Sequence, residues 1–283
     1  MAKNALRILK VATYNLEVSR RPEILTKNIY EMVREGVDIF CLQEVAPGEG
    51  EEFIINKILR RLGKDWQAEW SLSDTTQPIA FGNAIIWNEK ILKRIGSEIV
   101  LLPERREPRR HEKIFSRMIG FTGKLIIRRG LVIDFVLNKQ KIRICSVHAD
   151  LLGGASHRKR QVRFLLNHLK TLPMVQHTVI AGDFNTVNII FKDRERRELQ
   201  QMFATYEFSD VTDRIDWSHD IYQANMGRDG LLAKKVIENF NLHFRQKLDY
   251  IWAQNLEVEG ASRVETIGSD HLPLIALFKL ENM

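Results

Sequence analysis

Two short stretches of this sequence place a carboxylate close to a second polar residue of a type common in catalytic sites. In IAGDFNTV, Asp183 and Asn185 follow an apolar run, and in IGSDHLPLIALF, Asp270 and His271 precede one. Carboxylates and imidazoles that meet in one site are common groups of general acid–base catalysis. The first question is whether these four residues meet.

Further polar residues mark the ends of other apolar runs. Asn15 lies in VATYNLE, Glu44 in DIFCLQEV and His148 in IRICSVHADL. Asp249 lies inside KLDYIW, where a buried carboxylate is costly unless it is paired. Each residue alone has a structural explanation, such as a turn or an exposed strand end. Six such positions in one chain instead indicate a site assembled at strand ends.

The elements that would position these residues can be read from hydrophobic periodicity. Strand-like runs occur at about 7–14, 37–43, 83–87, 95–101, 119–127, 131–137, 141–148, 177–182, 247–253 and 273–280. Helical periodicity occurs at about 22–35, 51–63, 156–171 and 194–204. Strands outnumber helices and often follow one another directly, which favours a mixed α/β sandwich. Since no repeat or linker marks a boundary, we expect one domain over residues 1–283.

Composition excludes several classes of protein. Of the 283 residues, 44% are hydrophobic and 28% charged, which is typical of a chain with a real core. No apolar run reaches the roughly 18 residues of a membrane span, and the start does not resemble a secretory signal. Cys41 and Cys145 lie in apolar strand-like runs, which favours buried thiols over a disulfide. We therefore expect a cytoplasmic protein without stable membrane anchoring.

Positive charge is concentrated in one segment. The formal net charge is +7, and residues 105–129 alone hold nine Lys and Arg residues against two Glu residues. One interpretation is a solvated loop followed by a strand with a charged outer face. The other is a surface that follows a phosphate backbone, with Arg105, Arg106, Arg109 and Arg110 as substrate-binding residues.

The ordered series TYN, LQE, HADL, GDFN, LDYI and SDHLP resembles the endonuclease/exonuclease/phosphatase superfamily, the deoxyribonuclease I-like group of metal-dependent phosphoesterases. The resemblance extends from about residue 8 to residue 280, and GNAIIW supports it. It implies a four-layer sandwich, with two mixed β-sheets face to face and helices on the outside. The strand runs agree with that fold.

The resemblance also implies a divalent cation. Attack of water on a phosphodiester adds charge to the phosphoryl oxygens, and Mg²⁺ or Mn²⁺ neutralises that charge. Such hard cations prefer oxygen ligands. By its position in the series, Glu44 is the expected metal ligand, with Asn15 and Asp270 close by or sharing the ligand shell.

The remaining positions imply catalytic roles. Asp183 resembles the residue that orients or deprotonates the attacking water, and Asn185 would donate hydrogen bonds to a phosphate oxygen. His271 would contact the phosphate and transfer a proton, held in place by Asp249. His148 would be a second phosphate contact or the general acid.

Differences from the motifs of individual subfamilies reduce the number of candidate substrates. A histidine at position 148 and the motif YNLE disfavour an abasic-site repair nuclease, and LDYIW disfavours an inositol polyphosphate phosphatase. Three classes stay open: a nuclease, a phosphoesterase for phospholipid head groups (sphingomyelinase-like) or small phosphorylated metabolites, and a non-catalytic binding module. The intact catalytic positions disfavour the last class. The basic charge favours nucleic acid as the substrate, and no protein partner is implied.

Overall fold

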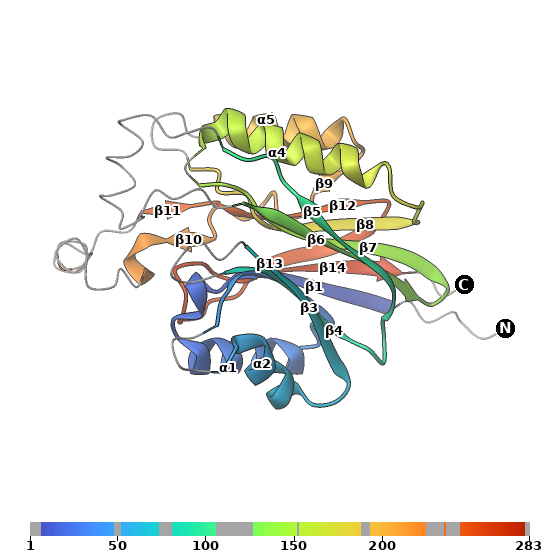
Figure 1. Cartoon of the computed structure of the whole chain (residues 1–283), viewed down its shortest axis with the longest axis vertical. Coiled ribbons are helices and arrows are strands. Elements are labelled where there is room, and N and C mark those ends of the chain that lie inside the picture. The colour runs from blue at the N-terminus through green and yellow to red at the C-terminus, as the bar shows by residue number, and fades with distance from the viewer. Residues whose placement is uncertain are drawn as a thin grey trace.

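The computed structural model of the chain has four layers, in which two β-sheets face each other and helices cover both outer faces (Figure 1). The residues that it describes are 7–47, 52–73, 81–105, 127–151, 153–187, 193–224, 235 and 244–280. This is the four-layer α/β sandwich that the sequence predicts. Within these ranges, no helix is long and apolar enough to cross a membrane.

The first sheet has six strands, and helices α1 (Pro22–Arg34) and α2 (Ile54–Leu62) cover its outer face. Its spatial order is β13 (Glu257–Arg263), β14 (Leu274–Leu280), β1 (Arg7–Asn15), β2 (Ile39–Val45), β4 (Gly82–Asn88) and β3 (Trp66–Leu72). Strands β1 and β2 are parallel, and the other neighbouring pairs are antiparallel. A 3-10 helix, η1 (Glu17–Ser19), follows β1.

The second sheet also has six strands, covered by helices α4 (Gly154–Leu169) and α5 (Arg194–Ala204). Its spatial order is β5 (Lys93–Leu101), β6 (Arg129–Leu137), β7 (Gln140–His148), β8 (His177–Asp183), β12 (Asp249–Gln254) and β9 (Ser209–Asp210). Only β7 and β8 are parallel among its described pairs. A two-stranded antiparallel ribbon of β10 (His219–Asp220) and β11 (Arg245–Gln246) lies beyond one end of the sheets, with η2 (Ile221–Gln223) after β10.

Helix α1 illustrates why the local sequence adopts these elements. Pro22 occupies its first turn, where a fixed φ suits the helix and no intrahelical N–H is needed. Leu25, Ile29 and Met32 share the buried face, as a spacing of three and four residues requires. The chain then leaves the helix at Gly36, whose φ of 89° favours glycine.

The main core lies between the two sheets. Val11 and Ile39 of the first sheet and Ile144 and Val179 of the second are fully buried in one apolar cluster. Two further clusters lie beneath the helix pairs, so the central strands are covered on both faces and are apolar throughout. Both cysteines are buried free thiols, as their positions in apolar strands predict.

The strand directions bring distant polar residues to one edge of the sandwich. Parallel strands end at the same edge, and Asn15 and Gln43 are paired at the ends of β1 and β2. His148 and Asp183 are likewise paired at the ends of β7 and β8. Asp249 begins the antiparallel strand β12 opposite Asp183. The topology therefore collects residues from both sheets at one edge.

Buried polar side chains join the two sheets directly behind this edge. The Gln43 amide donates to Ser146 Oγ of the facing sheet at 3.2 Å and accepts from Thr13 Oγ1 at 3.2 Å. Ser146 Oγ donates back to the Leu42 carbonyl at 3.3 Å. The Asn83 amide donates to the Arg129 carbonyl at 2.6 Å, again from one sheet to the other. These hydrogen bonds fix the relative position of the sheets where the polar residues gather.

Five observed strands were absent from the strands predicted by the sequence: the two-residue strands β9, β10 and β11, and the longer strands β3 and β13. β3 and β13 are edge strands, and their side chains are mostly exposed or half-buried. An edge strand need not carry the apolar pattern of a central strand, so periodicity alone does not reveal it. The predicted strand at 119–127 lies outside the described residues except for its last position.

Candidate active site

The turn after β8 depends on a glycine. Gly182 has a φ of 154°, and a Cβ there would lie 1.9 Å from the Val147 carbonyl oxygen of β7. Only glycine permits this approach, which brings Asp183 against the end of β7. Asn185 has a positive φ of 51°, and its N–H donates to Asp183 Oδ1 at 2.8 Å. The GDFN motif is therefore a tight turn that fixes the orientation of its own carboxylate.

The end of β2 has an irregular backbone at Glu44. The register between β2 and β4 shifts between Leu42 and Val45, as in a β-bulge, and Glu44 has a φ of 55°. A positive φ is uncommon for a residue with a side chain and often occurs at functional sites. This conformation turns Glu44 toward the site rather than continuing the pleat.

The loop before β14 is tied to the end of β1. Ser269 Oγ donates to the Asn15 carbonyl at 2.8 Å and accepts from the His271 N–H at 3.1 Å. Gly268 has a φ of 115°, and a Cβ there would lie 2.8 Å from Ile24 of α1. The GSDH segment therefore needs its glycine to pack closely, and the packing places His271 beside the strand ends.

Asp183 lies at the centre of the gathered side chains. Its Oδ2 accepts from the Asn15 amide at 3.0 Å and lies 3.5 Å from His148 Nε2 and 3.9 Å from His271 Nε2. Burial is the main cause that raises the pKa of Asp183 to about 7, opposed by His271 and reinforced by Asp249. Near neutral pH, this carboxyl group therefore occurs in both protonation states.

His271 is held by a second buried carboxylate. Its Nδ1 donates to Asp249 Oδ2 at 2.8 Å, and the Ser218 hydroxyl donates to the same oxygen at 2.7 Å. Burial opposes a charge on the ring, but Asp249, followed by Asp183 and Asp270, outweighs it and raises the pKa of His271 well above its ordinary value. His271 is therefore a protonated imidazolium whose Nε2 faces Asp183.

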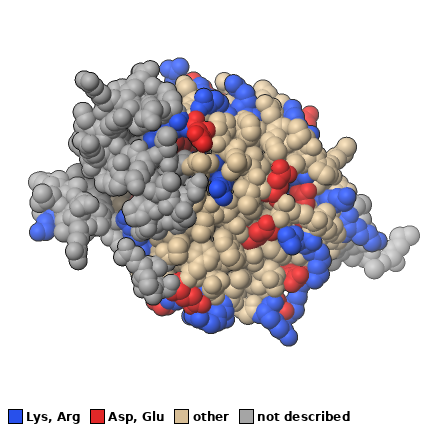
Figure 2. All heavy atoms as spheres, in the orientation of Figure 1, with Lys and Arg blue, Asp and Glu red and all other residues tan. Residues whose placement is uncertain are grey.

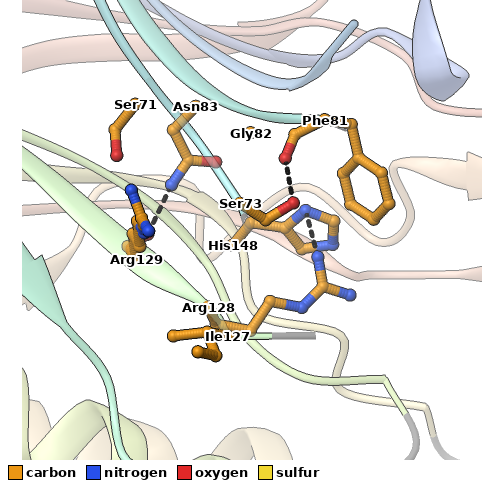
Figure 3. Close-up of a pocket in the computed structure, with 9 residues that line it drawn as sticks. All are labelled: Ser71, Ser73, Phe81, Gly82, Asn83, Ile127, Arg128, Arg129 and His148. Carbon is orange, nitrogen blue, oxygen red and sulfur yellow. Dashed lines mark hydrogen bonds between the residues drawn. The ribbon is translucent and has the colours of Figure 1, made fainter. Parts of the chain in front are cut away.

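His148 has the opposite protonation. Its Nδ1 lies 3.0 Å from Arg128 Nη1, and a guanidinium can only donate, so Nδ1 accepts and the proton resides on Nε2. Burial, and next the charge of Arg128, lower the pKa of His148 well below its ordinary value. Figure 3 shows this pair beside Phe81, whose ring centroid lies 5.4 Å from the Arg128 guanidinium carbon. His148 is thus a neutral imidazole.

The expected metal ligands provide oxygen atoms on the other side of His148. Glu44 Oε1 lies 3.9 Å from His148 Nε2. Burial, and next the neighbouring Asp270 carboxylate, raise the pKa of Glu44. Burial also opposes ionisation of Asp270, but a hydrogen bond from His219 and the charges of both neighbouring histidines outweigh it and lower its pKa. Two mutually repelling carboxylates beside the Asn15 amide fit a hard divalent cation, because a cation relieves that repulsion.

Three further residues contact the site and were not among the predicted site residues. Arg128 was counted only within the basic run, although it precedes a strand and contacts His148. Ser218 and His219 come from the β10 region, where no sequence motif marks them. His219 Nε2 lies 3.4 Å from Asp270 Oδ2. Only long-range pairing, the bridge between His219 and His271, could have revealed this contact.

The four candidate arginines of the basic segment are not all placed. Arg105 is buried, with Nε 3.8 Å from Asp150 Oδ2. Arg106, Arg109 and Arg110 lie outside the described residues. On the described part of the face in Figure 2, Lys and Arg are interspersed with Asp and Glu.

The site and fold agree with comparison to known families. Residues 12–271 match the sequence profile of the Endonuclease/Exonuclease/phosphatase family. The chain belongs to this family, whose members are hydrolytic phosphoesterases that use divalent metal ions. It is therefore a phosphoesterase of this class. No curated protein sequence matches the chain significantly.

Solved structures of low sequence identity share the fold. D. rerio TDP2 complexed with a single-strand DNA product has a TM-score of 0.66 and 15% identity, covering 96% of this chain and 98% of that chain. An endonuclease/exonuclease/phosphatase from Bacteroides vulgatus has a TM-score of 0.67 and 15% identity, covering 97% and 100%. ANGEL2, a 2',3'-cyclic phosphatase, has a TM-score of 0.63 and 15% identity, covering 98% and 96%.

Proposed function

We propose that the chain is a divalent-metal-dependent phosphodiesterase that hydrolyses nucleic acid. One observation carries the proposal: Asp183, with a pKa of about 7, lies between a neutral and a protonated histidine. Hydrolysis of a phosphodiester needs a base for water and donors for the anionic phosphate, and this arrangement supplies both.

The proposed metal ligands are Glu44, Asn15 and Asp270, with Mg²⁺ or Mn²⁺ as the cation. When bound, the cation would neutralise the charge that develops on the phosphoryl oxygens. The Asn15 Oδ1 atom already accepts from the Glu17 N–H at 3.0 Å, which holds its amide in a fixed orientation. The amide nitrogen of Asn15 donates to Asp183 Oδ2 at 3.0 Å, so a cation would use the second lone pair of Oδ1.

Asp183 is the proposed base. A group whose pKa lies near the working pH can take a proton from water and return it within one cycle. His271 donates from Nε2 to a phosphate oxygen, because both of its ring nitrogens carry protons. Asp249 keeps that ring oriented and its charge favoured, in the way carboxylates orient histidines in other hydrolases.

His148 and Asn185 complete the set of donors. The proton on His148 Nε2 points to the Asp183 and Glu44 side of the site, where it can reach a phosphate oxygen or the leaving group. Asn185 donates one amide hydrogen to the Ala149 carbonyl at 3.0 Å, which leaves its second hydrogen for the phosphate. Arg128 fixes the tautomer of His148 and so determines which nitrogen donates.

Nucleic acid is the proposed substrate because the net charge of +7 favours a polyanion. The solved structure of D. rerio TDP2 with its single-strand DNA product shows that this fold accommodates such a ligand. Arg106, Arg109 and Arg110 are proposed to contact phosphates, whereas Arg105 is tied to Asp150 and would anchor the start of the segment. We further propose that residues 1–283 form one domain and that the protein is cytoplasmic.

The decisive experiment is a substrate comparison in Mg²⁺ or Mn²⁺ and in chelator. Single-stranded DNA, duplex DNA, RNA, sphingomyelin, a phosphomonoester and a chromogenic phosphodiester would be incubated with the full chain. We expect metal-dependent cleavage of the nucleic acids and of the chromogenic diester. Hydrolysis of sphingomyelin alone, or of the monoester alone, would refute the nuclease proposal in favour of the lipid or metabolite alternative. Full activity in chelator would refute the dependence on a divalent metal.

A pair of variants tests the assigned ligand. Glu44→Gln keeps the shape of the side chain but removes the charge that a hard cation needs, so metal affinity and turnover should both fall. Glu23→Gln is the matched control, because the Glu23 side chain is 81% exposed on α1. Equal metal titration curves for Glu44→Gln and the parent would exclude Glu44 as a ligand.

A further inference from the structure

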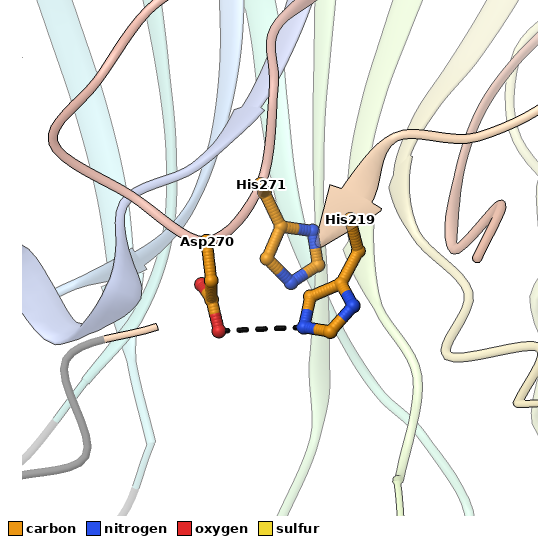
Figure 4. Close-up of side chains that lie close together, drawn as sticks. All are labelled: His219, Asp270 and His271. Carbon is orange, nitrogen blue, oxygen red and sulfur yellow. Dashed lines mark ion pairs between the residues drawn. The ribbon is translucent and has the colours of Figure 1, made fainter. Parts of the chain in front are cut away.

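His219, Asp270 and His271 form a second cluster, which shares Asp270 and His271 with the proposed catalytic site and adds His219. Each offers one ligand atom, and these atoms lie within 4.8 Å of one another. His219 Nε2 is 3.4 Å from Asp270 Oδ2, and the two imidazole centroids are 4.9 Å apart. Figure 4 shows the three side chains turned toward one another from β10 and from the loop before β14.

The donor set differs from that of a magnesium site. Asp249 occupies His271 Nδ1, so the cluster offers two imidazole Nε2 atoms and one carboxylate oxygen. Imidazole suits zinc and other borderline transition metals, whereas Mg²⁺ prefers oxygen ligands. The affinity of such a site for divalent first-row cations is lowest for Mn²⁺, rises to Cu²⁺ and falls again at Zn²⁺. This chemistry selects a zinc-like cation over magnesium.

The cluster is held in place before any cation binds. The Asp220 N–H donates to the Asp270 carbonyl at 2.9 Å, and the Leu272 N–H donates to the Ser218 carbonyl at 2.7 Å. These two bonds flank His219 and join its segment to that of Asp270 and His271. Asp249, which accepts from the His271 ring, is the carboxylate partner that commonly orients a metal-binding histidine.

The cluster is accessible from solvent. The side chains of His219 and Asp270 are 16% and 19% exposed, whereas that of His271 is 7% exposed. The cluster therefore lies at the edge of the core rather than deep inside it.

We propose that His219, Asp270 and His271 bind a zinc-like divalent cation that inhibits the enzyme. The claim of inhibition rests on the proposed function. The bound cation would occupy His271 Nε2, which would otherwise contact the phosphate, and Asp270, which would otherwise bind the metal beside Glu44. The cation replaces the proton on His271 Nε2, which passes to solvent, and forms bonds to Nε2 of each ring and to Asp270 Oδ2.

Zinc binding is measured on the full chain by calorimetry in excess Mg²⁺. We expect one Zn²⁺ per chain. Loss of a residue that only orients a metal ligand typically lowers metal affinity about 10- to 100-fold. His219→Ala and His219→Gln remove a ligand itself, so the Zn²⁺ affinity should fall by at least that factor. His168→Ala is the matched control, because His168 pairs with the distant Glu98. Inhibition of turnover by Zn²⁺, scaled to each variant's own rate, should shift by the same factor.

A measurement on the unaltered chain avoids any dependence on folding of the variants. The cluster loaded with Cu²⁺ should show pulsed-EPR modulation from the remote nitrogens of two imidazoles. The absence of that modulation, or unchanged Zn²⁺ affinity in both His219 variants, overturns the site. Zinc binding that depends on His219 in a chain without hydrolytic activity supports the site and overturns the proposed function. Normal Mg²⁺-dependent hydrolysis unaffected by bound Zn²⁺ overturns the inhibition.

Discussion

Replacing Asp183 with asparagine should stabilise the metal-free fold at alkaline pH while it abolishes turnover. Burial raises the pKa of Asp183 from 3.8 to about 7. The folded protein therefore binds this proton more tightly than the unfolded chain. The resulting stability is fully present below the unfolded pKa and is lost as the pH rises through the folded value. The asparagine side chain does not ionise in this pH range, so the stability of the variant should not decline in this way as the pH rises.

The magnitude follows from the two pKa values. A difference of roughly three pH units, at about 1.4 kcal/mol each, corresponds to about 4 kcal/mol lost between about pH 4 and pH 8. The pKa of His271 is also raised above its ordinary value of 6.5, so the unfolded chain releases this proton before the folded protein does, and stability falls further above about pH 6.5. His271 is present in both the parent and Asp183→Asn, so this decline largely cancels in the difference between them. The hydrogen bond from the Asn15 amide is weakened in the variant, which offsets the gain by about 1 kcal/mol at every pH.

Urea unfolding in chelator, at a series of pH values, measures this effect. The free energy of unfolding of the parent should fall relative to that of Asp183→Asn as the pH rises toward 8. Glu23→Gln, with its exposed side chain, should instead follow the parent. If the parent and Asp183→Asn keep a constant difference in stability across the series, then the buried carboxylate does not titrate near neutrality and its role as the base loses its support.

Three further substitutions test the site. Gly182→Ala places a Cβ 1.9 Å from a carbonyl oxygen of β7 and should cost about 3 kcal/mol, measured by the urea midpoint. Asp249→Asn removes the charge that raises the pKa of His271, so kcat should fall about 10²- to 10⁴-fold and the alkaline limb of the pH–rate profile should move to lower pH. Arg128→Lys lacks the planar donor that holds His148, so kcat should fall about tenfold while KM stays nearly constant.

The sequence predicts the central strands and the residues at their ends well, because both depend on local patterns. Strands buried on both faces are apolar throughout, and polar residues such as Asn15 and His148 interrupt them where they end. The edge strands β3 and β13 lack this pattern, because many of their side chains are exposed to solvent or only half-buried. His219 was missed for a different reason: it belongs to a two-residue strand whose position depends on distant partners, Gln246 of β11 and His271.

The hydrogen bond between Gln43 and Ser146 has a consequence for how activity and folding are related. Asn15, Glu44, Asp270 and His271 belong to the first sheet and its loop, whereas His148, Asp183 and Asp249 belong to the second. A partly folded chain with one intact sheet holds only part of this proposed set, so we expect it to have no turnover. The catalytic rate of this enzyme therefore reports on the docking of its two sheets. Substitution of Gln43 or Ser146 should lower the fraction of molecules that are active, although neither side chain lies in the proposed substrate site.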